Sequence, residues 1–174
     1  MRAPHLVFIS QFRLESDPLS VWRMLAEAAT WPHWWPGPRV AGGARARSPI
    51  AGSAMPTPVR QQDSRWGRAL AIANPLHLDI TFADPPRLIE GRVAGHWMSS
   101  ALWLVERAAS PSATDVTLRW ECGLHGRWMP RLIWLIRPAL ASCHFNSVRM
   151  GARAMAKRLD CRLSDLTRWS GGPE

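Results

Sequence analysis

The chain has 174 residues, of which 47% are hydrophobic and 20% charged, and its formal net charge is +9. These values are ordinary for a soluble globular protein, and the length suits one domain spanning residues 1–174. They argue against a membrane-spanning helix, because the most apolar stretch, residues 128–145, is interrupted by Arg131 and Arg137. The unusual feature of the composition is the presence of 11 Trp and no Tyr.

The positive charge is spread along the whole chain. Of the 22 basic residues only Lys157 is a lysine, and the arginines run from Arg2 to Arg168 without a basic cluster. Nucleic-acid-binding proteins usually concentrate basic residues on one face, so we expect no nucleic-acid partner. Peripheral contact with an anionic membrane surface stays open as an alternative.

The three cysteines, Cys122, Cys143 and Cys161, lie far apart without a CxxC pair. This spacing favours buried thiols in a reducing cytoplasm over disulfides or a zinc site. The six histidines form neither HxH nor HExxH, and no P-loop, GxSxG or dinucleotide-binding motif occurs. We therefore expect neither a metal nor a cofactor, and the N-terminal apolar run LVFIS is too short for a signal peptide.

Residues 5–15 predict the first strand. Apolar and polar side chains alternate along it, as expected for a strand with two different faces. The side chains predicted to share one face are those of Leu6, Phe8, Ser10, Phe12 and Leu14.

A helix is predicted directly after this strand. Asp17 is a suitable N-cap, and Pro18 occupies the first helical position, where its missing N–H does no harm. The helix should end near Thr30, because Pro32 disfavours helical geometry in the residue before it. Its predicted apolar stripe comprises Leu19, Trp22, Leu25 or Ala26, and Ala29.

A loop-rich insertion and then a series of strands follow. Residues 36–63 hold five prolines and four glycines, so we expect one short strand or helix at most in them. From Arg65 to Leu124 the pattern is that of antiparallel strands joined by turns. The clearest strand, predicted over residues 115–124, has one apolar and one polar face, which is typical of a sheet covered on one side. Its apolar face comprises Val116, Leu118, Trp120 and Cys122.

The chain is predicted to end in a long helix over residues 139–166, and residues 130–137 form either a separate turn or a kinked lead-in to it. Apolar residues recur there at intervals of three and four, and the opposite face is polar. So long an apolar stripe needs a long apolar partner, for which the inner face of the sheet is the candidate. The stripe comprises Ala141, Phe145, Val148, Ala152, Met155, Leu159 and Leu163.

This order of elements predicts the α+β class, with strands and helices segregated along the chain. A strongly twisted antiparallel sheet curls, and a long helix across its concave side does not fill the whole concavity. We therefore predict a cavity between the sheet, the C-terminal helix and the intervening loops.

Two stretches resemble a known superfamily. Residues 18–37, PLSVWRMLAEAATWPHWWPG, are similar to its first-helix segment, and residues 114–159 are similar to its last strand and C-terminal helix. The superfamily is SRPBCC, or START-like, and in particular its bacterial polyketide cyclase/dehydrase-type and lipid-transport-like domains. The resemblance implies the helix-grip fold, an antiparallel sheet of about seven strands around a long C-terminal helix. Residues 39–63 depart from the family pattern, and Cys143 stands where the family often has Asn.

Aromatic residues supply the predicted ligand-binding surface. In the WPHWWPGP segment the indoles either cap the core or form a stiff aromatic wall of the cavity, and different indoles can take different roles. On the strand around residues 97–106 we expect Trp97 and Trp103 to face inward. The predicted ligand-binding residues are Trp34, Trp35, Trp66, Trp97, Trp103, Trp120, His144, Phe145 and Val148.

His144 is the most suggestive polar residue. It lies at the border of the apolar stripe, either as a core histidine hydrogen-bonded to backbone or as a donor or acid/base group facing the cavity. Glu90 and Arg92 share one face of a strand, and they form either a buried pair that orients a polar ligand group or a solvated pair. These three residues are the weak candidates for catalysis.

The sequence therefore predicts a cytoplasmic bacterial protein that binds a small lipid-, polyketide- or aromatic-like molecule in a Trp-lined cavity. One alternative is an enzyme of the polyketide cyclase/dehydratase type, which would use cavity polar groups to move protons. A second alternative is a membrane-surface or protein-interaction module that uses the Arg-rich exterior and the Trp-rich segment. The absence of a catalytic motif favours binding over catalysis.

Overall fold

The computed structural model describes residues 5–27, 30–35, 38–40, 57–61, 76–94, 98–110, 112–123 and 129–171. The described strands form one antiparallel sheet in the order β2-β3-β4-β5-β6-β7-β1-β8. The strands are β1 His5–Leu14, β2 Pro38–Val40, β3 Thr57–Gln61, β4 Leu76–Asp84, β5 Leu88–Ala94, β6 Met98–Arg107, β7 Thr114–Gly123 and β8 Leu163–Gly171. The helices are α1 Pro18–Ala26, α2 Trp31–Trp34 and α4 Met129–Arg158.

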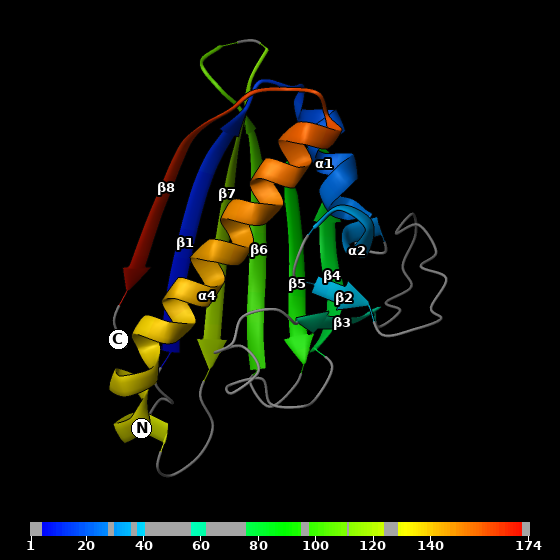
Figure 1. Cartoon of the computed structure of the whole chain (residues 1–174). Helices are drawn as coiled ribbons and strands as arrows, with labels where there is room; N and C mark the ends of the chain where they lie inside the picture. The colour runs from blue at the N-terminus through cyan, green and yellow to red at the C-terminus, as the bar shows by residue number, and fades with distance from the viewer. Residues whose placement is uncertain are drawn as a thin grey trace.

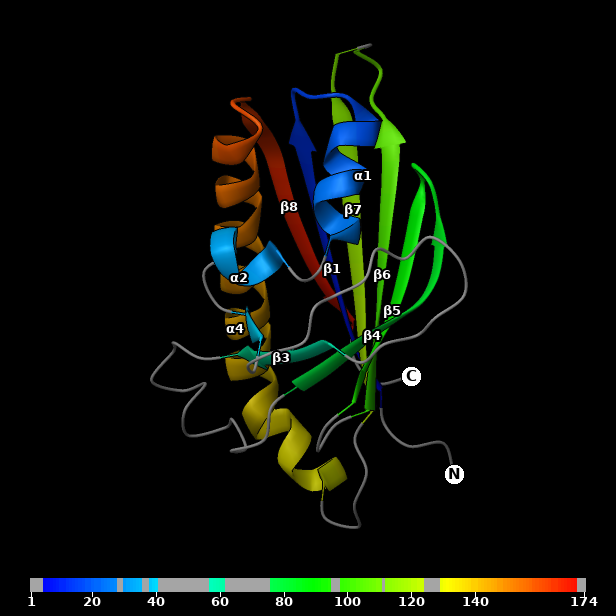
Figure 2. The same ribbon diagram turned by 90° about the vertical axis from the view of Figure 1, so that its right-hand side faces the viewer.

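The three described helices lie on the same side of the curved sheet (Figures 1 and 2). The long helix α4 crosses the sheet diagonally and contacts β1, β8 and α2, whereas α1 contacts β6. A long C-terminal helix held against the inner face of an antiparallel sheet is the helix-grip arrangement, so the predicted α+β fold is confirmed.

The strand register brings apolar residues from neighbouring strands into rows on the inner face. In one row Phe12 of β1 lies opposite Val116 of β7, which lies opposite Val105 of β6, and all three are buried. Trp103 is also buried on this face, so the inward phase predicted for it is confirmed. The five residues predicted to share one face of β1 are all buried, which confirms that prediction too: Leu6, Phe8, Ser10, Phe12 and Leu14.

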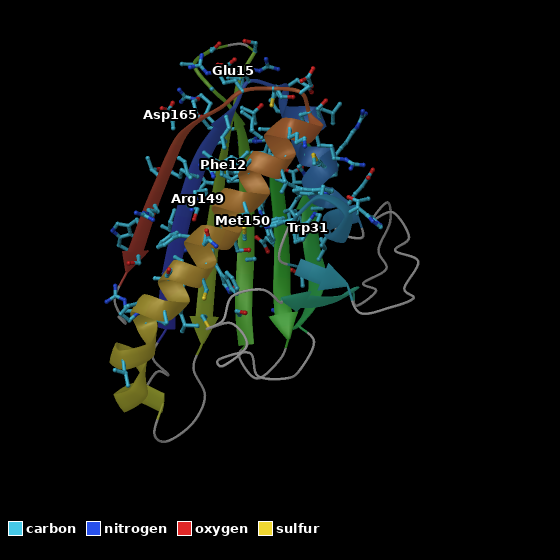
Figure 3. All side chains as sticks on the ribbon, in the orientation of Figure 1. Phe12, Glu15, Trp31, Arg149, Met150 and Asp165 are labelled. Atoms are coloured by element: carbon cyan, nitrogen blue, oxygen red, sulfur yellow. The ribbon has the colours of Figure 1, made fainter. Side chains whose placement is uncertain are left out.

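The buried residues form two hydrophobic clusters. The major cluster joins α1, α2, the middle of the sheet and the C-terminal half of α4, and it includes Phe12 and Trp31 (Figure 3). The minor cluster lies at the other end of α4 and consists of Leu6, Phe8 and Cys122, with Leu140, Ala141 and Phe145 packed against it.

The first helix differs from its prediction in both length and buried face. It ends at Ala26, and a separate helical turn, α2, follows. Pro32 is tolerated there because the first helical residues need no N–H for intrahelical bonds. Leu19, expected in the stripe, is exposed, since the face turned to the core comprises Pro18, Val21, Met24, Leu25 and Ala26.

The C-terminal helix includes the lead-in before residue 139, with Pro138 inside it, and ends earlier than predicted. The helix begins at Met129 and ends at Arg158, and the remaining chain forms β8, so the sheet has eight described strands instead of about seven. Between α4 and β8 the chain reverses its direction at Asp160. The φ of 48° at this residue is left-handed and therefore incompatible with a continuing helix. The insertion at 36–63 also holds two short strands, β2 and β3, where one short element was expected.

Candidate functional site

The helix α4 holds His144 against β1 and β7. Its side chain is 3% exposed, and its Nε2 atom lies 3.4 Å from the hydroxyl oxygen of Ser10 on β1. The imidazole stacks on Phe8, also on β1, with ring centroids 5.3 Å apart and an interplanar angle of 26°. Thus β1 supplies both a polar partner and an aromatic face to one buried histidine.

Two further aromatic rings surround the imidazole. Trp120 of β7 meets it nearly edge-on with centroids 5.0 Å apart, and Phe145 does so at 5.2 Å. We call Phe8, Ser10, Trp120, His144 and Phe145 the His144 site. Within this site the imidazole therefore contacts one hydroxyl group and three aromatic rings.

Burial keeps the ionisable groups of this region neutral. Because desolvation disfavours a charged imidazole, it lowers the pKa of His144 to about 4. Burial also raises the pKa of the Cys122 thiol, two residues from Trp120 on β7, to about 11. At neutral pH the imidazole therefore carries one N–H group and one lone pair, and it can both donate and accept a hydrogen bond.

Two buried polar atoms of the site have unused hydrogen-bonding capacity. Nδ1 of His144 and Nε1 of Trp120 have no hydrogen-bond partner in the described part of the chain. An unsatisfied buried polar group costs about 1–3 kcal/mol, and native structures contain few of them. Two such atoms on rings that touch each other mark this place as a candidate binding site.

The sheet beside Trp120 carries small residues. Across the inner face Trp120 lies opposite Ala101 of β6, which lies opposite Gly91 of β5. The next row along the strands is bulkier and holds Leu118, Trp103 and Ile89 at the same three strands. At this level of the sheet, β6 and β5 therefore carry no side chain larger than a methyl group.

The predicted Trp34, Trp35 and Trp103 belong to the major cluster, and their rings are not among those that contact the His144 imidazole in the described part of the chain. The rings of Trp34 and Trp35 stack at 5.6 Å, and Trp31 contacts both Trp35 and Trp103, at 5.1 and 5.4 Å. The indole N–H groups are used within the protein: Trp31 donates to the Leu25 carbonyl, Trp34 to the Thr30 hydroxyl and Trp35 to the Ser147 carbonyl. This bonding is that of a packed core.

Glycine at position 151 of α4 accommodates one of these indoles. A Cβ atom placed on Gly151 would lie 2.4 Å from Cε2 and 2.6 Å from Nε1 of Trp35. No side chain can replace this glycine without moving Trp35 or the helix. The WPHWW segment therefore docks α2 onto α4.

The remaining predicted site residues are divided. Val148 is buried in the major cluster, one helical turn from His144. Glu90 and Arg92 are exposed, whereas Ile89 and Gly91 between and beside them are buried, so the two charged residues lie on the outer face of β5. Trp66 and Trp97 lie outside the described residues.

Sequence reasoning brought together Trp120, His144 and Phe145 but did not assign Phe8 and Ser10 to the site. A signal was present in β1, where Ser10 is the one polar residue on a face otherwise made of Leu6, Phe8, Phe12 and Leu14. A lone hydroxyl on a buried face needs a hydrogen-bond partner, and His144 is that partner.

Within the described ranges, no group of three or more His, Cys, Asp or Glu side chains is placed to hold a metal ion. The same part of the chain contains no helix with the length and apolar character needed to cross a bilayer.

The sheet and helix define a helix-grip protein, and solved structures show the same fold. A START superfamily protein from Mycobacterium smegmatis superposes with a TM-score of 0.56 at 10% identity, over 88% of this chain and 97% of that one. A norcoclaurine synthase point mutant from Thalictrum flavum, in complex with a transition-state analogue, has a TM-score of 0.62 at 10% identity, over 91% and 96%.

The di-domain ARO/CYC protein StfQ from the steffimycin biosynthetic pathway gives a TM-score of 0.64 at 13% identity. That alignment covers 90% of this chain and 53% of StfQ. No protein-family model matches the sequence, and a search of curated proteins found no match. The structures confirm the fold that the sequence resemblance implied.

Proposed function

We propose that this protein binds a small, largely apolar molecule between α4 and the inner face of the sheet, at the His144 site. The observation that carries the proposal is the pair of unpartnered buried atoms, His144 Nδ1 and Trp120 Nε1, within aromatic surroundings. Binding sites for small molecules are mostly apolar and contain a few polar groups that fix the ligand's orientation. The proposed site has this composition.

The fold supports the same proposal. The norcoclaurine synthase of this fold is described in complex with a transition-state analogue, so a helix-grip structure can hold a small organic molecule. We place the function in the cytoplasm because the cysteine spacing is that of reduced thiols. The Trp-rich segment gives no support to membrane contact, since Trp31, Trp34 and Trp35 are buried.

Filling the site tests the proposal. Ala141 is partly buried against the minor cluster, one helical turn before Phe145, and Ser142 beside it is exposed. We expect Ala141→Phe to abolish binding of naphthalene, measured by equilibrium dialysis, without lowering the melting temperature. The matched control, Ser142→Phe, should bind naphthalene as the wild type does.

The opposite result is equally clear. If Ala141→Phe unfolds the protein while the wild type binds no naphthalene, the region is packed solid and the proposal is wrong. Native mass spectrometry of the protein purified from its own host provides a second measurement, in which a co-purifying hydrophobic molecule is expected.

A second candidate function is proton transfer of the cyclase/dehydratase type. It is favoured by one observation, a neutral buried imidazole with an unused Nδ1 atom whose Nε2 lies beside the Ser10 hydroxyl. Glu90 and Arg92 take no part in it, because they lie on the outer face. The variant His144→Ala distinguishes the two functions. Loss of turnover with retained binding supports an enzyme, whereas unchanged turnover together with unchanged binding speaks against an enzyme.

A further inference from the structure

The two unpartnered atoms of the His144 site restrict the chemistry of its ligand. The indole N–H of Trp120 can only donate, so its partner must offer a lone pair. An ammonium group has none and is excluded. The His144 and Trp120 rings are in contact, with centroids 5.0 Å apart, and we therefore consider a single ligand group that bonds both polar atoms.

The role of His144 Nδ1 depends on the hydrogen bond at the other ring nitrogen. If Nε2 donates to the Ser10 oxygen, Nδ1 is an acceptor, and if the Ser10 hydroxyl donates to Nε2, Nδ1 carries the proton. A hydroxyl group suits both cases, because it donates one hydrogen bond and accepts others. A carbonyl oxygen suits only one of them.

A charged ligand group is disfavoured by the surroundings. Among the described residues, the imidazole contacts Phe8, Ser10, Trp120 and Phe145, and none of these side chains carries a charge. Burying an unpaired carboxylate in such a place is far more costly than burying a hydroxyl with hydrogen-bond partners. Because burial lowers the pKa of His144, the imidazole carries no positive charge at neutral pH that could pair with a carboxylate.

We infer that the ligand of the His144 site carries a neutral alcohol or phenol hydroxyl on an apolar body, and that this hydroxyl accepts from Trp120 Nε1 and bonds His144 Nδ1. The inference rests on the proposed function, since it names the chemical class of the molecule bound there. In this inference the apolar body lies against Phe8 and Phe145, whose rings contact each other in the minor cluster.

Three probes with one ring system test this inference: naphthalene, 2-naphthol and 2-naphthoate. The hydroxyl of 2-naphthol must leave water on binding, so without partners in the site it would weaken binding relative to naphthalene. With both partners used, we expect 2-naphthol to bind about tenfold more tightly than naphthalene, the effect of roughly one net hydrogen bond. Naphthoate should bind most weakly of the three.

The variant Trp120→Phe keeps an aromatic ring and removes the N–H group. Within this variant, the ratio of the affinities for 2-naphthol and naphthalene should fall to about one, and His144→Phe should lower the same ratio through the other atom. A preference that survives both substitutions overturns the inference.

The wild-type measurements distinguish failure of the hydroxyl inference from failure of the proposed binding function. If the three probes bind equally, or naphthoate binds best, the hydroxyl inference is wrong and the proposed binding function stands. If none of the three binds, the proposed function itself fails at this site.

Discussion

His144 is deeply buried, and burial lowers its pKa from the ordinary value of about 6.5 to about 4. Its ring is packed by Phe8, Trp120 and Phe145, and in the described part of the chain its polar contact is the hydroxyl of Ser10. Protonation would place a positive charge among aromatic side chains, and no carboxylate of the described residues pairs with it. The residue that gives the site its polarity is therefore also a point at which acid destabilises the fold.

We predict that stability falls as the pH drops from about 6.5, the ordinary pKa of histidine, toward about 4, its pKa in the folded protein. In this window the unfolded chain binds the proton more readily than the native state, so the free energy of unfolding rises with pH. The loss attributable to His144 should reach about 3 kcal/mol near pH 4.

Urea unfolding of wild type and His144→Phe at several pH values measures this contribution. The variant should lose that part of the pH dependence, whereas replacing the exposed His33 by Gln should leave it intact. Equal pH profiles for wild type and His144→Phe would show that the imidazole is not desolvated in the native state.

At the level of elements, α2 packs against α4 through the indole of Trp35 and the glycine at position 151. Trp35 donates to the carbonyl of Ser147 at 3.0 Å, and its ring lies against Gly151. Glycine within a helix normally costs stability relative to alanine, so its presence here needs a reason. The close approach of the indole is that reason.

We predict that Gly151→Ala destabilises the protein by about 1–3 kcal/mol, as overpacking of a core does, although a helical Gly→Ala change usually stabilises. Chemical denaturation measures the sign directly. In a Trp35→Leu background the clash is absent, so the same substitution should become neutral or stabilising. Destabilisation in both backgrounds would mean that Trp35 is not the obstacle.

The start of α1 provides a second prediction at this scale. The carboxylate of Asp17 accepts from the backbone N–H of Ser20 at 2.9 Å, and this contact with Ser20 lowers the pKa of Asp17. Asp17→Ala should cost about 1 kcal/mol in thermal or urea unfolding. Asp17→Asn, which keeps an accepting oxygen, should cost less, and equal costs for the two variants would argue against the cap.

For the molecule as a whole, β8 forms one edge of the sheet. It pairs with β1 from Leu163 to Gly171, and the Ser170 carbonyl accepts from Arg137 of α4 at 3.1 Å. Arg13 of β1 bonds Asp115 of β7 and Asp165 of β8, so one guanidinium bridges three strands. The C-terminal strand thus links the helix and the sheet after the chain has reversed.

We predict that ending the chain at Arg162, which deletes β8, lowers the melting temperature by about 10 °C, since several net hydrogen bonds of roughly 1 kcal/mol each are lost. Differential scanning calorimetry checks this expectation. A chain that ends at Gly171 keeps the strand and serves as the control. An unchanged melting temperature on deletion of β8 would show that this edge contributes no net stability.

Local patterns were enough to predict much of this protein. The alternation in β1 and β7, the Asp17–Pro18 helix start and the apolar stripe of Val148, Ala152 and Met155 depend on neighbouring residues alone, and the structure contains all of them. In β4, a register shift between Ile80 and Phe82 places the Phe82 ring on the exposed face, although Phe82 follows Ile80 by two residues. A shift of one residue is not encoded in polarity.

What the sequence by itself determined was the class of fold, because strand and helix periodicities are local and their order along the chain restricts the architecture. Only the tertiary structure decided that three tryptophans pack into the core, that Ser10 meets His144 across 134 positions of sequence, and that the chain turns at Asp160 to add a strand. These features depend on which surfaces meet in space, and residue spacing along the chain carries no record of that.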